Sequence, residues 1–360
     1  MRLPVVNEKE PNAPLAERLR DERFNAAGEL HHVVDGERLR CVACAHRCVM
    51  APGAAGACGV RFNHSGVLRV PFGYVARRYL RAIETNTVFH VLPGAPALTF
   101  GMYGCDLRCP YCHNHRISQA LRDGADDEEP SSISAQALVD EALAQGARAL
   151  CAAYNEPMIS AEWTRHVFEV ARSNGLRTAL ISDGHTTPEA LRYMRPHTDV
   201  LRVDLKAHTD ASYKKLGGRL QPVLDAIALA HALGFWVEVV TLVVPGINHD
   251  QRTLGEVGAR LRDISPEIPW HLNGFVPRYR LAGSQPTNPL LLTLAAGAAY
   301  VEGSRFVYVG NVAACGELAH TRCPECRTVL IRRHDYRTIG SSLREGACAS
   351  CAAPLPGVWT

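Results

Sequence analysis

Between about residues 95 and 310, short hydrophobic runs alternate with segments whose hydrophobic residues recur at helical spacing. Strands are predicted at residues 97–101, 148–153, 177–182, 200–205, 235–243, 269–275 and 305–310. Helices are predicted between them, at 134–146 with Ser134 as N-cap, at 161–175, and from Pro188 onward. This alternation predicts a parallel sheet with helices outside, and six or seven units favour a partial (β/α)6-type TIM barrel over a short doubly wound sheet.

Polar residues follow the predicted strands at one consistent end. They are the C-x3-C segment after the first strand, YNEP (154–157) after the second, SDG (182–184) after the third, DLK (204–206), VPG (244–246), and GNV (310–312) after the last. In a β/α barrel, the carboxyl ends of the strands converge on one rim, where active sites are built. The sequence therefore predicts a site at that rim.

Composition and charge narrow the class of protein. The 360 residues are 47% hydrophobic and 21% charged, with a formal net charge of +3. This charge is too small to indicate nucleic-acid binding. No long apolar run predicts a membrane span, and no export signal is visible, so a cytoplasmic location is expected. Eleven of the thirteen cysteines fall into three groups, which in a reducing compartment indicates metal centres rather than disulfides.

Two of these groups flank the predicted barrel, which suggests an N-terminal Cys-rich segment (1–75), a core (76–312) and a C-terminal domain (313–360). The C-terminal group has the spacing C-x2-C-x21-C-x2-C, so a zinc-ribbon-like domain is favoured over an iron–sulfur cluster. Four thiolates close such a site and make it structural. Its ligands are Cys323, Cys326, Cys348 and Cys351.

The N-terminal group also has four cysteines, spaced C-x2-C-x3-C-x9-C. Spacing leaves open whether they bind zinc or a second iron–sulfur cluster, and whether His46 replaces one of them. The ligands are expected to be Cys41, Cys44, Cys48 and Cys58.

The central group differs because it has only three cysteines, Cys105, Cys109 and Cys112. A closed Cys3His zinc site would need His113 or His115 as the fourth ligand. Three thiolates on a [4Fe–4S] cluster instead leave one iron without a protein ligand, so that this iron can bind a substrate or cofactor. The position of the three cysteines at a barrel rim favours the cluster over the zinc site. The two histidines then border a cofactor. Tyr111, just before the last ligand, is a candidate to pack on a cofactor ring. The two remaining cysteines, expected to be small buried residues, are Cys151 and Cys315.

C-x3-C-x2-C at the end of the first strand of a βα-repeat chain is typical of radical S-adenosylmethionine (SAM) enzymes, and the chain resembles that superfamily. The segment GCDLRCPYCHN (104–114) is most similar to the branch containing glycyl-radical-enzyme activases. Over nearly all of residues 40–360, the chain resembles the radical SAM member of the AmmeMemoRadiSam system. The segments that carry this resemblance are CVACAHRCVM…GACGVR, VFHVLPG, YNEP, VDLKA, VEVVTLVVPGIN, PWHLNGF, VYVGNV and CPEC…PGVW.

The resemblance implies roles for residues at the rim. Asn155 and Glu156 stand where many members carry GGE, a segment that accepts hydrogen bonds from the SAM ammonium group. Asp204 and Lys206 match an Asp-x-Lys pair that lines the SAM site in activases. His271 matches a histidine near SAM. Asp204, Lys206 and His271 are expected to take part in catalysis as well as in cofactor binding.

A further candidate for SAM contact lies after the third strand, where relatives often read TNG and this chain has Ser182, Asp183 and Gly184. Asp183 is the member of this segment that is expected to contact SAM.

The implied reaction uses SAM bound to the open iron of the cluster. One electron, from a donor such as flavodoxin or ferredoxin, cleaves a C–S bond and gives methionine and a 5′-deoxyadenosyl radical that abstracts hydrogen from a substrate. The substrate is not identified by the sequence and is either a protein or peptide or a small metabolite. The alternatives are cleavage of a different C–S bond with transfer of another SAM-derived group, or a non-catalytic zinc-binding nucleic-acid or scaffold protein.

Overall fold

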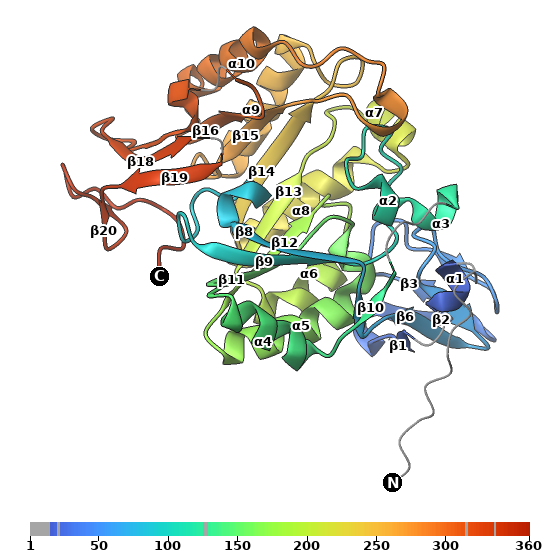
Figure 1. Ribbon diagram of the computed structural model, residues 1–360. Helices are drawn as coiled ribbons and strands as arrows, with labels where there is room; N and C mark the ends of the chain where they lie inside the picture. The colour runs from blue at the N-terminus through green and yellow to red at the C-terminus, as the bar shows by residue number, and fades with distance from the viewer. Residues whose placement is uncertain (1–14, 20–21, 125–128, 314–315, 335) are drawn as a thin grey trace.

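The central feature of the computed structural model is an eight-stranded sheet in the order β16-β15-β14-β13-β12-β11-β9-β8 (Figure 1). Seven of its strands are parallel, as the sequence predicts, and β8 pairs antiparallel with β9 at one edge. The structure describes residues 15–19, 22–124, 129–313, 316–334 and 336–360. The strands of this sheet are β8 (Arg77–Ala82), β9 (Pro96–Gly101), β11 (Ala149–Ala152), β12 (Arg177–Ser182), β13 (Val200–Asp204), β14 (Trp236–Val243), β15 (Trp270–Gly274) and β16 (Val307–Gly310).

Helices follow the parallel strands and begin where the sequence predicts. The Ser134 hydroxyl accepts a hydrogen bond from the Ala137 amide at 3.1 Å and caps α4, and Pro188 occupies the first turn of α6. None of the described helices is long and apolar enough to cross a membrane. The helices around the sheet are α4 (Ala135–Ala144), α5 (Ala161–Ser173), α6 (Pro188–Met194), α7 (Asp210–Leu216), α8 (Leu220–Ala232), α9 (Gln251–Ile264) and α10 (Pro289–Val301).

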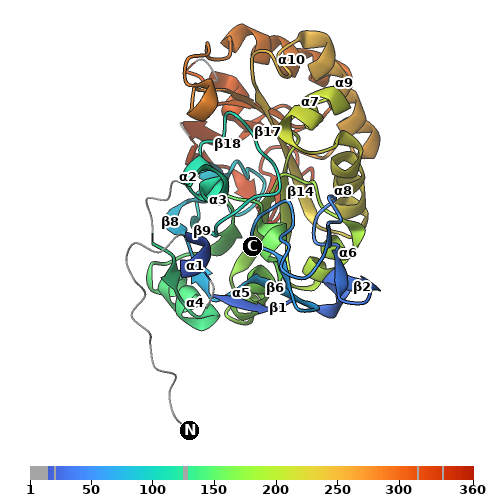
Figure 2. The ribbon, with the colours of Figure 1, turned by 90° about the vertical axis from the view of Figure 1, so that its right-hand side faces the viewer.

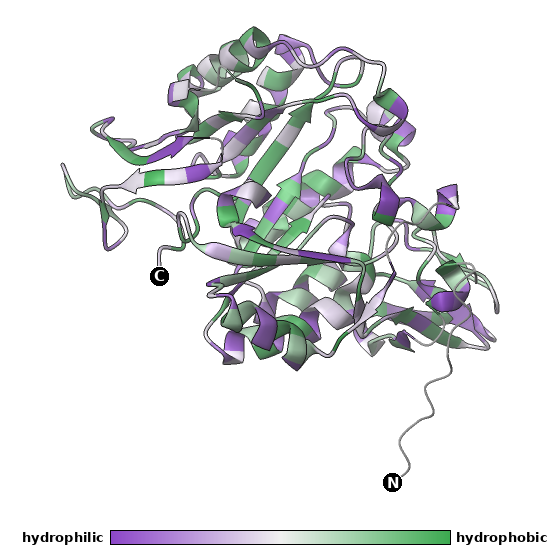
Figure 3. Ribbon diagram, viewed as in Figure 1, coloured by the Kyte–Doolittle hydropathy of each residue, from purple (hydrophilic) through white to green (hydrophobic). Residues whose placement is uncertain are grey.

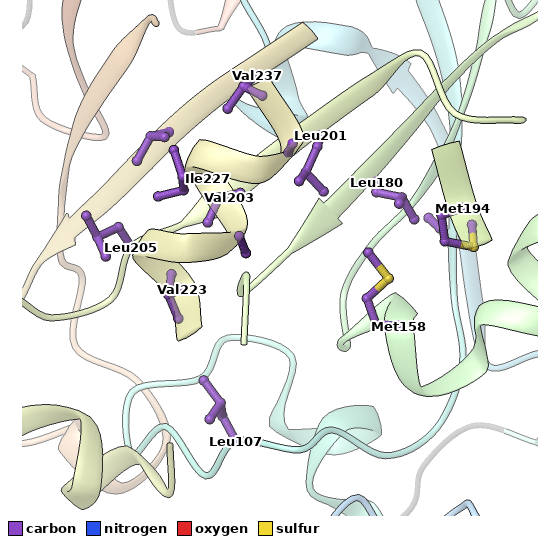
Figure 4. Close-up of a cluster of buried hydrophobic side chains, with 14 of the residues drawn as sticks. Leu107, Met158, Leu180, Met194, Leu201, Val203, Leu205, Val223, Ile227 and Val237 are labelled. Carbon is purple, nitrogen blue, oxygen red and sulfur yellow. The ribbon is translucent and has the colours of Figure 1, made fainter. Parts of the chain in front are cut away.

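The two faces of each parallel strand have different neighbours, because side chains alternate along a strand. Leu201, Val203 and Val237 of β13 and β14 face Val223 and Ile227 of α8 (Figure 4). Hydrophobic residues continue along these strands (Figure 3). On the other face, charged residues replace some of the hydrophobic ones, and these residues position the site described below.

The N-terminal residues form small antiparallel sheets outside the central sheet, shown in blue in Figure 1. Strand β7 pairs with residues 131–132 of β10, so this segment is tied to the chain between β9 and α4. Figure 2 shows the same segment beside α5 and α6. Its elements are α1 (Leu15–Arg18), β1 (Arg23–Asn25), β2 (His31–Asp35), β3 (Arg38–Cys41), β4 (Val49–Met50), β5 (Phe62–His64), β6 (Val67–Pro71), β7 (Tyr74–Val75) and β10 (Ser131–Ser132).

The C-terminal strands lie at the opposite side of the central sheet, in red in Figure 1. The Arg333 side chain is 2% exposed and donates to the Phe89 carbonyl and, at 2.7 Å, to the Thr321 hydroxyl, so these strands are docked on the core. They are β17 (Thr321–Arg322), β18 (Val329–His334), β19 (Arg337–Ser341), β20 (Leu343–Arg344) and β21 (Ala347–Cys348). Cys315 lies outside the described residues.

Candidate functional site

A cavity of about 350 Å³ opens at the carboxyl ends of the parallel strands. All three central cysteines line it, together with polar residues from the ends of β11, β12, β13 and β15 and from the C-terminal strands. The rim predicted from the sequence is therefore a cavity into which the expected chemical groups converge. Those groups are Cys105, Cys109, Cys112, Tyr111, Asn155, Glu156, Asp183, Asp204 and Lys206.

The loop that carries the three cysteines runs from the end of β9 to α2 (His115–Ser118). Arg122 of α3 (Ala120–Asp123) donates hydrogen bonds to the backbone carbonyls of Cys105 at 2.6 Å and Leu107 at 2.9 Å. Gly104 has a φ of 89° and lies where a Cβ would clash with Val60, so only glycine fits. The loop is thus fixed by side-chain contacts to its backbone.

The chemistry of the central cysteines fits a metal cluster. Burial raises the pKa of Cys109 to about 12 and that of Cys105 well above its ordinary value. A thiolate at these positions needs compensating positive charge, which bound metal supplies. The three sulfurs do not all lie within 4.8 Å of one another, whereas the Cys105 sulfur lies within that distance of carboxylate oxygens of Asp106 and Asp183. This donor set fits a cluster in which each sulfur binds a different iron.

Neither neighbouring histidine completes a closed shell. His113 lines the cavity, and its Nε2 lies 3.3 Å from the Val276 carbonyl oxygen. The His115 ring stacks on the Tyr279 ring, with 4.4 Å between the ring centroids. The Nδ1 atom of His115 lies 3.1 Å from the Cys112 carbonyl oxygen. The described contacts of both rings are with protein groups other than the cysteine sulfurs.

Asn155 and Glu156 connect neighbouring strand ends. Asn155 Oδ1 accepts a hydrogen bond from the Met102 amide at 3.0 Å. The Glu156 carboxylate accepts from the Met158 amide at 2.9 Å, the Asp183 amide at 2.7 Å and the Ser182 hydroxyl. This side chain therefore fixes the loops after β11 and β12 relative to each other.

Tyr154 explains how YNEP replaces a glycine-rich segment. Its φ is 72°, a left-handed conformation that glycine adopts readily and an aromatic residue rarely does. The backbone before Glu156 thus keeps a glycine-like path without glycine.

Asp183 lines the cavity and has one carboxylate oxygen without a hydrogen-bond partner. Its Oδ1 accepts from the His185 amide at 3.0 Å, whereas its buried Oδ2 has no hydrogen-bond partner. Burial and the nearby Asp183 carboxylate raise the pKa of Asp106 well above its ordinary value. Burial and the same carboxylate likewise raise the pKa of Glu156. Three acidic side chains, Asp106, Glu156 and Asp183, are therefore crowded together beside the cavity.

Asp204 and Lys206 form a charged group with Arg202, a residue that the sequence analysis missed. Lys206 Nζ donates to Asp204 Oδ2 at 3.1 Å, and Arg202 contacts Asp204 Oδ1. Although burial opposes both shifts, Arg202 and Lys206 lower the pKa of Asp204, and Asp204 and Cys109 raise that of Lys206. The group is therefore ionised and carries two cations for one carboxylate. Arg202 could have been found from the sequence, because it is a charged residue within the hydrophobic run VLRVDL.

Tyr111 lies between a core residue and the cavity. The centroid of its ring lies 6.5 Å from that of the Phe275 ring, in an edge-to-face arrangement. The buried Tyr111 hydroxyl has no hydrogen-bond partner. Burial raises the pKa of Tyr111 well above its ordinary value, so the hydroxyl is neutral. An aromatic face and an unused donor thus border the site.

His271 lies outside the cavity lining, at a deeper level of the same strand face as Asn273. Its Nε2 lies 2.7 Å from Glu238 Oε2, and both side chains are at most 1% exposed. Burial lowers the pKa of His271, so the ring is neutral and donates to the carboxylate. Its expected proximity to SAM stays a prediction, while the observed partner, Glu238, was missed by sequence reasoning.

The two outer cysteine groups have different sulfur spacings. In the C-terminal group, Cys323 Sγ lies 3.6 Å from Cys351 Sγ, and Cys326 Sγ lies 3.6 Å from Cys348 Sγ. All four sulfurs lie within 4.8 Å of one another. This spacing fits one tetrahedrally coordinated ion.

In the N-terminal group, no three of the four described sulfurs lie within 4.8 Å of one another. Burial raises the pKa of Cys58 to about 11 and that of Cys44 well above its ordinary value. The His46 ring contacts the Asp106 carbonyl oxygen at 3.2 Å and the ring of His185 at 4.8 Å, so it is directed at the central loop.

Comparison with known proteins places these features in a family. The Radical SAM superfamily matches residues 100–254, which include the three central cysteines and the polar rim up to Lys206. An uncharacterized protein of Methanocaldococcus jannaschii is 31% identical over 326 residues, covering 89% of this chain and 96% of that protein. The chain belongs to the radical SAM superfamily. It is therefore an enzyme of the superfamily that uses SAM and an iron–sulfur cluster.

Other radical SAM proteins show more limited similarity. The pyruvate formate-lyase-activating enzyme of Staphylococcus epidermidis is 27% identical over 180 residues, covering 46% of this chain and 68% of that enzyme. The pyruvate formate-lyase 1-activating enzyme of Escherichia coli is 26% identical over 217 residues, covering 54% of this chain and 84% of that enzyme. The structure of a radical SAM methyltransferase from Sphaerobacter thermophilus aligns over 83% of this chain and 80% of its own, at 12% identity and a TM-score of 0.47.

Proposed function

We propose that this protein reductively cleaves SAM at a [4Fe–4S] cluster held by Cys105, Cys109 and Cys112, and uses the product to abstract hydrogen from a substrate. The observation that carries the proposal is that these three sulfurs face one cavity, with carboxylates on one wall and the cations of Arg202 and Lys206 on another. When bound, the cluster supplies an open iron for SAM and the electron that splits a C–S bond, normally giving methionine and a 5′-deoxyadenosyl radical.

The acidic side of the cavity suits the SAM ammonium group. Asp183 lines the cavity and its buried Oδ2 has no hydrogen-bond partner, so a charge-assisted hydrogen bond would satisfy this oxygen. Asn155 lines the same wall and orients the loop through Met102. Glu156 has its oxygens occupied by protein donors and acts as a positioning residue.

The basic side of the cavity suits the rest of SAM. Lys206 and Arg202 lie around Asp204 with one positive charge in excess, which suits the SAM carboxylate, while Asp204 can accept from ribose hydroxyls. The Tyr111 ring is placed to pack on the adenine. These residues bind and orient SAM.

The rest of the chain has supporting roles in this proposal. Residues 76–312 form a partial (β/α)6-type TIM barrel, flanked by the N-terminal Cys-rich segment (1–75) and a zinc-ribbon-like domain (313–360). The 3.6 Å sulfur pairs of the C-terminal group support Zn²⁺ there. A cytoplasmic flavodoxin- or ferredoxin-type protein supplies electrons. The substrate is a protein, a peptide or a small metabolite.

Anaerobic reconstitution with iron and sulfide tests the proposal. The protein should turn brown, show a [4Fe–4S] EPR signal after dithionite reduction, and release 5′-deoxyadenosine from SAM. Release of a different SAM fragment would indicate cleavage of another C–S bond. A colourless protein that holds only zinc and does not bind SAM would contradict the proposal and favour a structural zinc protein.

A further inference from the structure

The N-terminal cysteine group lies directly against the loop of the central cysteines. Arg122 Nη2 donates to the Ala57 carbonyl at 2.6 Å and to the Cys105 carbonyl at 2.6 Å. Ala57 is the residue before Cys58, so one guanidinium joins the backbone beside a ligand of each group.

Two further contacts bring the same segments together. The Cys58 carbonyl and the Val60 side chain fill the space beside Gly104, leaving no room there for a Cβ. His46 Nε2 lies 3.2 Å from the carbonyl oxygen of Asp106, which follows Cys105. The N-terminal segment thus packs against this side of the central loop.

The spacing of the sulfurs separates the N-terminal group from the C-terminal one. Around a single Zn²⁺, with Zn–S distances of about 2.3 Å, tetrahedral geometry holds four sulfurs about 3.8 Å apart. The C-terminal pairs at 3.6 Å match this value. No three of the N-terminal sulfurs lie within 4.8 Å of one another, and the central three share this wider spacing. Wide spacing is what a cluster needs, because each thiolate binds its own iron.

We propose that Cys41, Cys44, Cys48 and Cys58 hold a second [4Fe–4S] cluster that passes electrons to the central one through the backbone contact at Arg122. The relay function rests on the proposed function of the central site, whereas the metal assignment does not. In each transfer, a reduced donor protein of the flavodoxin or ferredoxin class gives one electron to the N-terminal cluster. The N-terminal cluster then passes this electron to the central cluster and returns to its oxidised state. No bond forms or breaks and no proton moves.

Metal analysis of a triple variant, Cys105→Ala with Cys109→Ala and Cys112→Ala, tests the assignment. After anaerobic reconstitution, we expect this variant to keep about four iron and one zinc per chain and a reducible [4Fe–4S] EPR signal. Adding Cys44→Ser and Cys48→Ser should remove that iron and leave the zinc. A triple variant with about two zinc and no iron would overturn the proposal, because the N-terminal group would then be a zinc site.

The relay is tested by the rate at which the central cluster is reduced, followed by rapid-freeze EPR in full-length protein. The measured quantity is the ratio of the rate with reduced flavodoxin to the rate with dithionite, so that any defect in the central loop cancels. Arg122→Met should lower this ratio at least about tenfold, and Arg122→Lys should restore part of it.

Arg219→Met is the matched control. Arg219 also holds the N-terminal segment, by donating to the Ala45 carbonyl, but it does not contact the central loop in the described hydrogen bonds. The ratio of the flavodoxin rate to the dithionite rate in Arg219→Met should stay within about twofold of the wild-type ratio. If Arg122→Met does not fold, Cys44→Ser with Cys48→Ser should lower the ratio in its place. Unchanged ratios in the Arg122 and cysteine variants would overturn the relay. Two clusters with a working relay but no SAM cleavage would instead contradict only the proposed function.

Discussion

Ser182 and Glu156 join two neighbouring strand ends at the cavity. The Ser182 hydroxyl lies 2.9 Å from one carboxylate oxygen of Glu156 and 3.0 Å from the other. The Asp183 amide donates to the same carboxylate at 2.7 Å. Glu156 therefore holds the segment that carries Asp183, which lines the cavity.

Glu156→Gln should damage both stability and SAM binding. The side-chain NH2 of glutamine would face the Met158 or Asp183 amide, two donors that now point at carboxylate oxygens. A buried donor left without an acceptor costs about 1–3 kcal/mol. We expect the free energy of unfolding to fall by this amount and the Kd for SAM to rise, as measured by urea unfolding and equilibrium dialysis.

Ser182→Ala is the graded control for this prediction. It removes one donor and leaves both amide contacts of Glu156, so its effect should be about 1 kcal/mol or less. If Ser182→Ala is as damaging as Glu156→Gln, the hydroxyl rather than the carboxylate holds the two loops.

Asp183→Asn should weaken SAM binding without unfolding the protein. Asparagine keeps the oxygen that accepts from the His185 amide and removes the negative charge at the free position. Loss of one charge-assisted hydrogen bond should raise the Kd for SAM about tenfold or more. Asp225→Asn, on the exposed face of α8, makes the same change away from the cavity and should leave binding unchanged. Equal affinity in both variants would remove Asp183 from the site.

Glu238→Gln should destabilise the core beneath the cavity. Glu238 accepts hydrogen bonds from the Phe89 and His90 amides and from the Trp236 and His271 rings. Although burial opposes the shift, the hydrogen bond from His271 and the charges that His271 and His90 gain on protonation in acid lower the pKa of Glu238 to about 2 from its ordinary 4.5. A shift of this size corresponds to about 3 kcal/mol of stability.

The pH dependence of this contribution follows from the sign of the shift. Because the pKa is lowered on folding, the stabilisation is fully present above pH 4.5 and is lost as the pH falls towards 2. In denaturant unfolding of apoprotein, Glu238→Gln should be less stable at pH 7 and lose less stability on acidification than wild type. Parallel curves for the two proteins would contradict this assignment.

Cys326→Ser should remove metal from the C-terminal group alone. Its sulfur lies 3.6 Å from that of Cys348 in the closely spaced set of four. We expect zinc to fall from about one per chain to nearly none while iron content stays the same, as measured by mass spectrometry of the purified protein. A parallel loss of iron would show that this group holds an iron–sulfur cluster instead.

The sequence predicted the parallel sheet and the position of the site because both depend on local patterns. The hydrophobic run RTALIS matches β12 (Arg177–Ser182), and Ser134 caps α4 as expected. Strand β8 was missed because none of the residues of RRYLRA is fully buried and three of the six are arginine, so it lacks the hydrophobic run of the inner strands.

The contacts between distant segments could not be predicted in the same way. Glu238 and His271 meet because β14 and β15 pair in one register, and no motif records that register. Arg122 joins Ala57 to Cys105 through backbone carbonyls, which any residue at those positions would provide. Such contacts depend on tertiary structure rather than on the identity of the accepting residues.

The most direct test of the proposed function is the release of 5′-deoxyadenosine from SAM by reconstituted, dithionite-reduced protein. We predict release by the wild type and none by the Cys109→Ala variant. Cys323→Ala, which alters a cysteine of the C-terminal group, should still release it. The contradicting result would be a wild-type protein that carries its iron–sulfur clusters and binds SAM but leaves SAM intact, or a Cys109→Ala variant that cleaves SAM as fast as wild type.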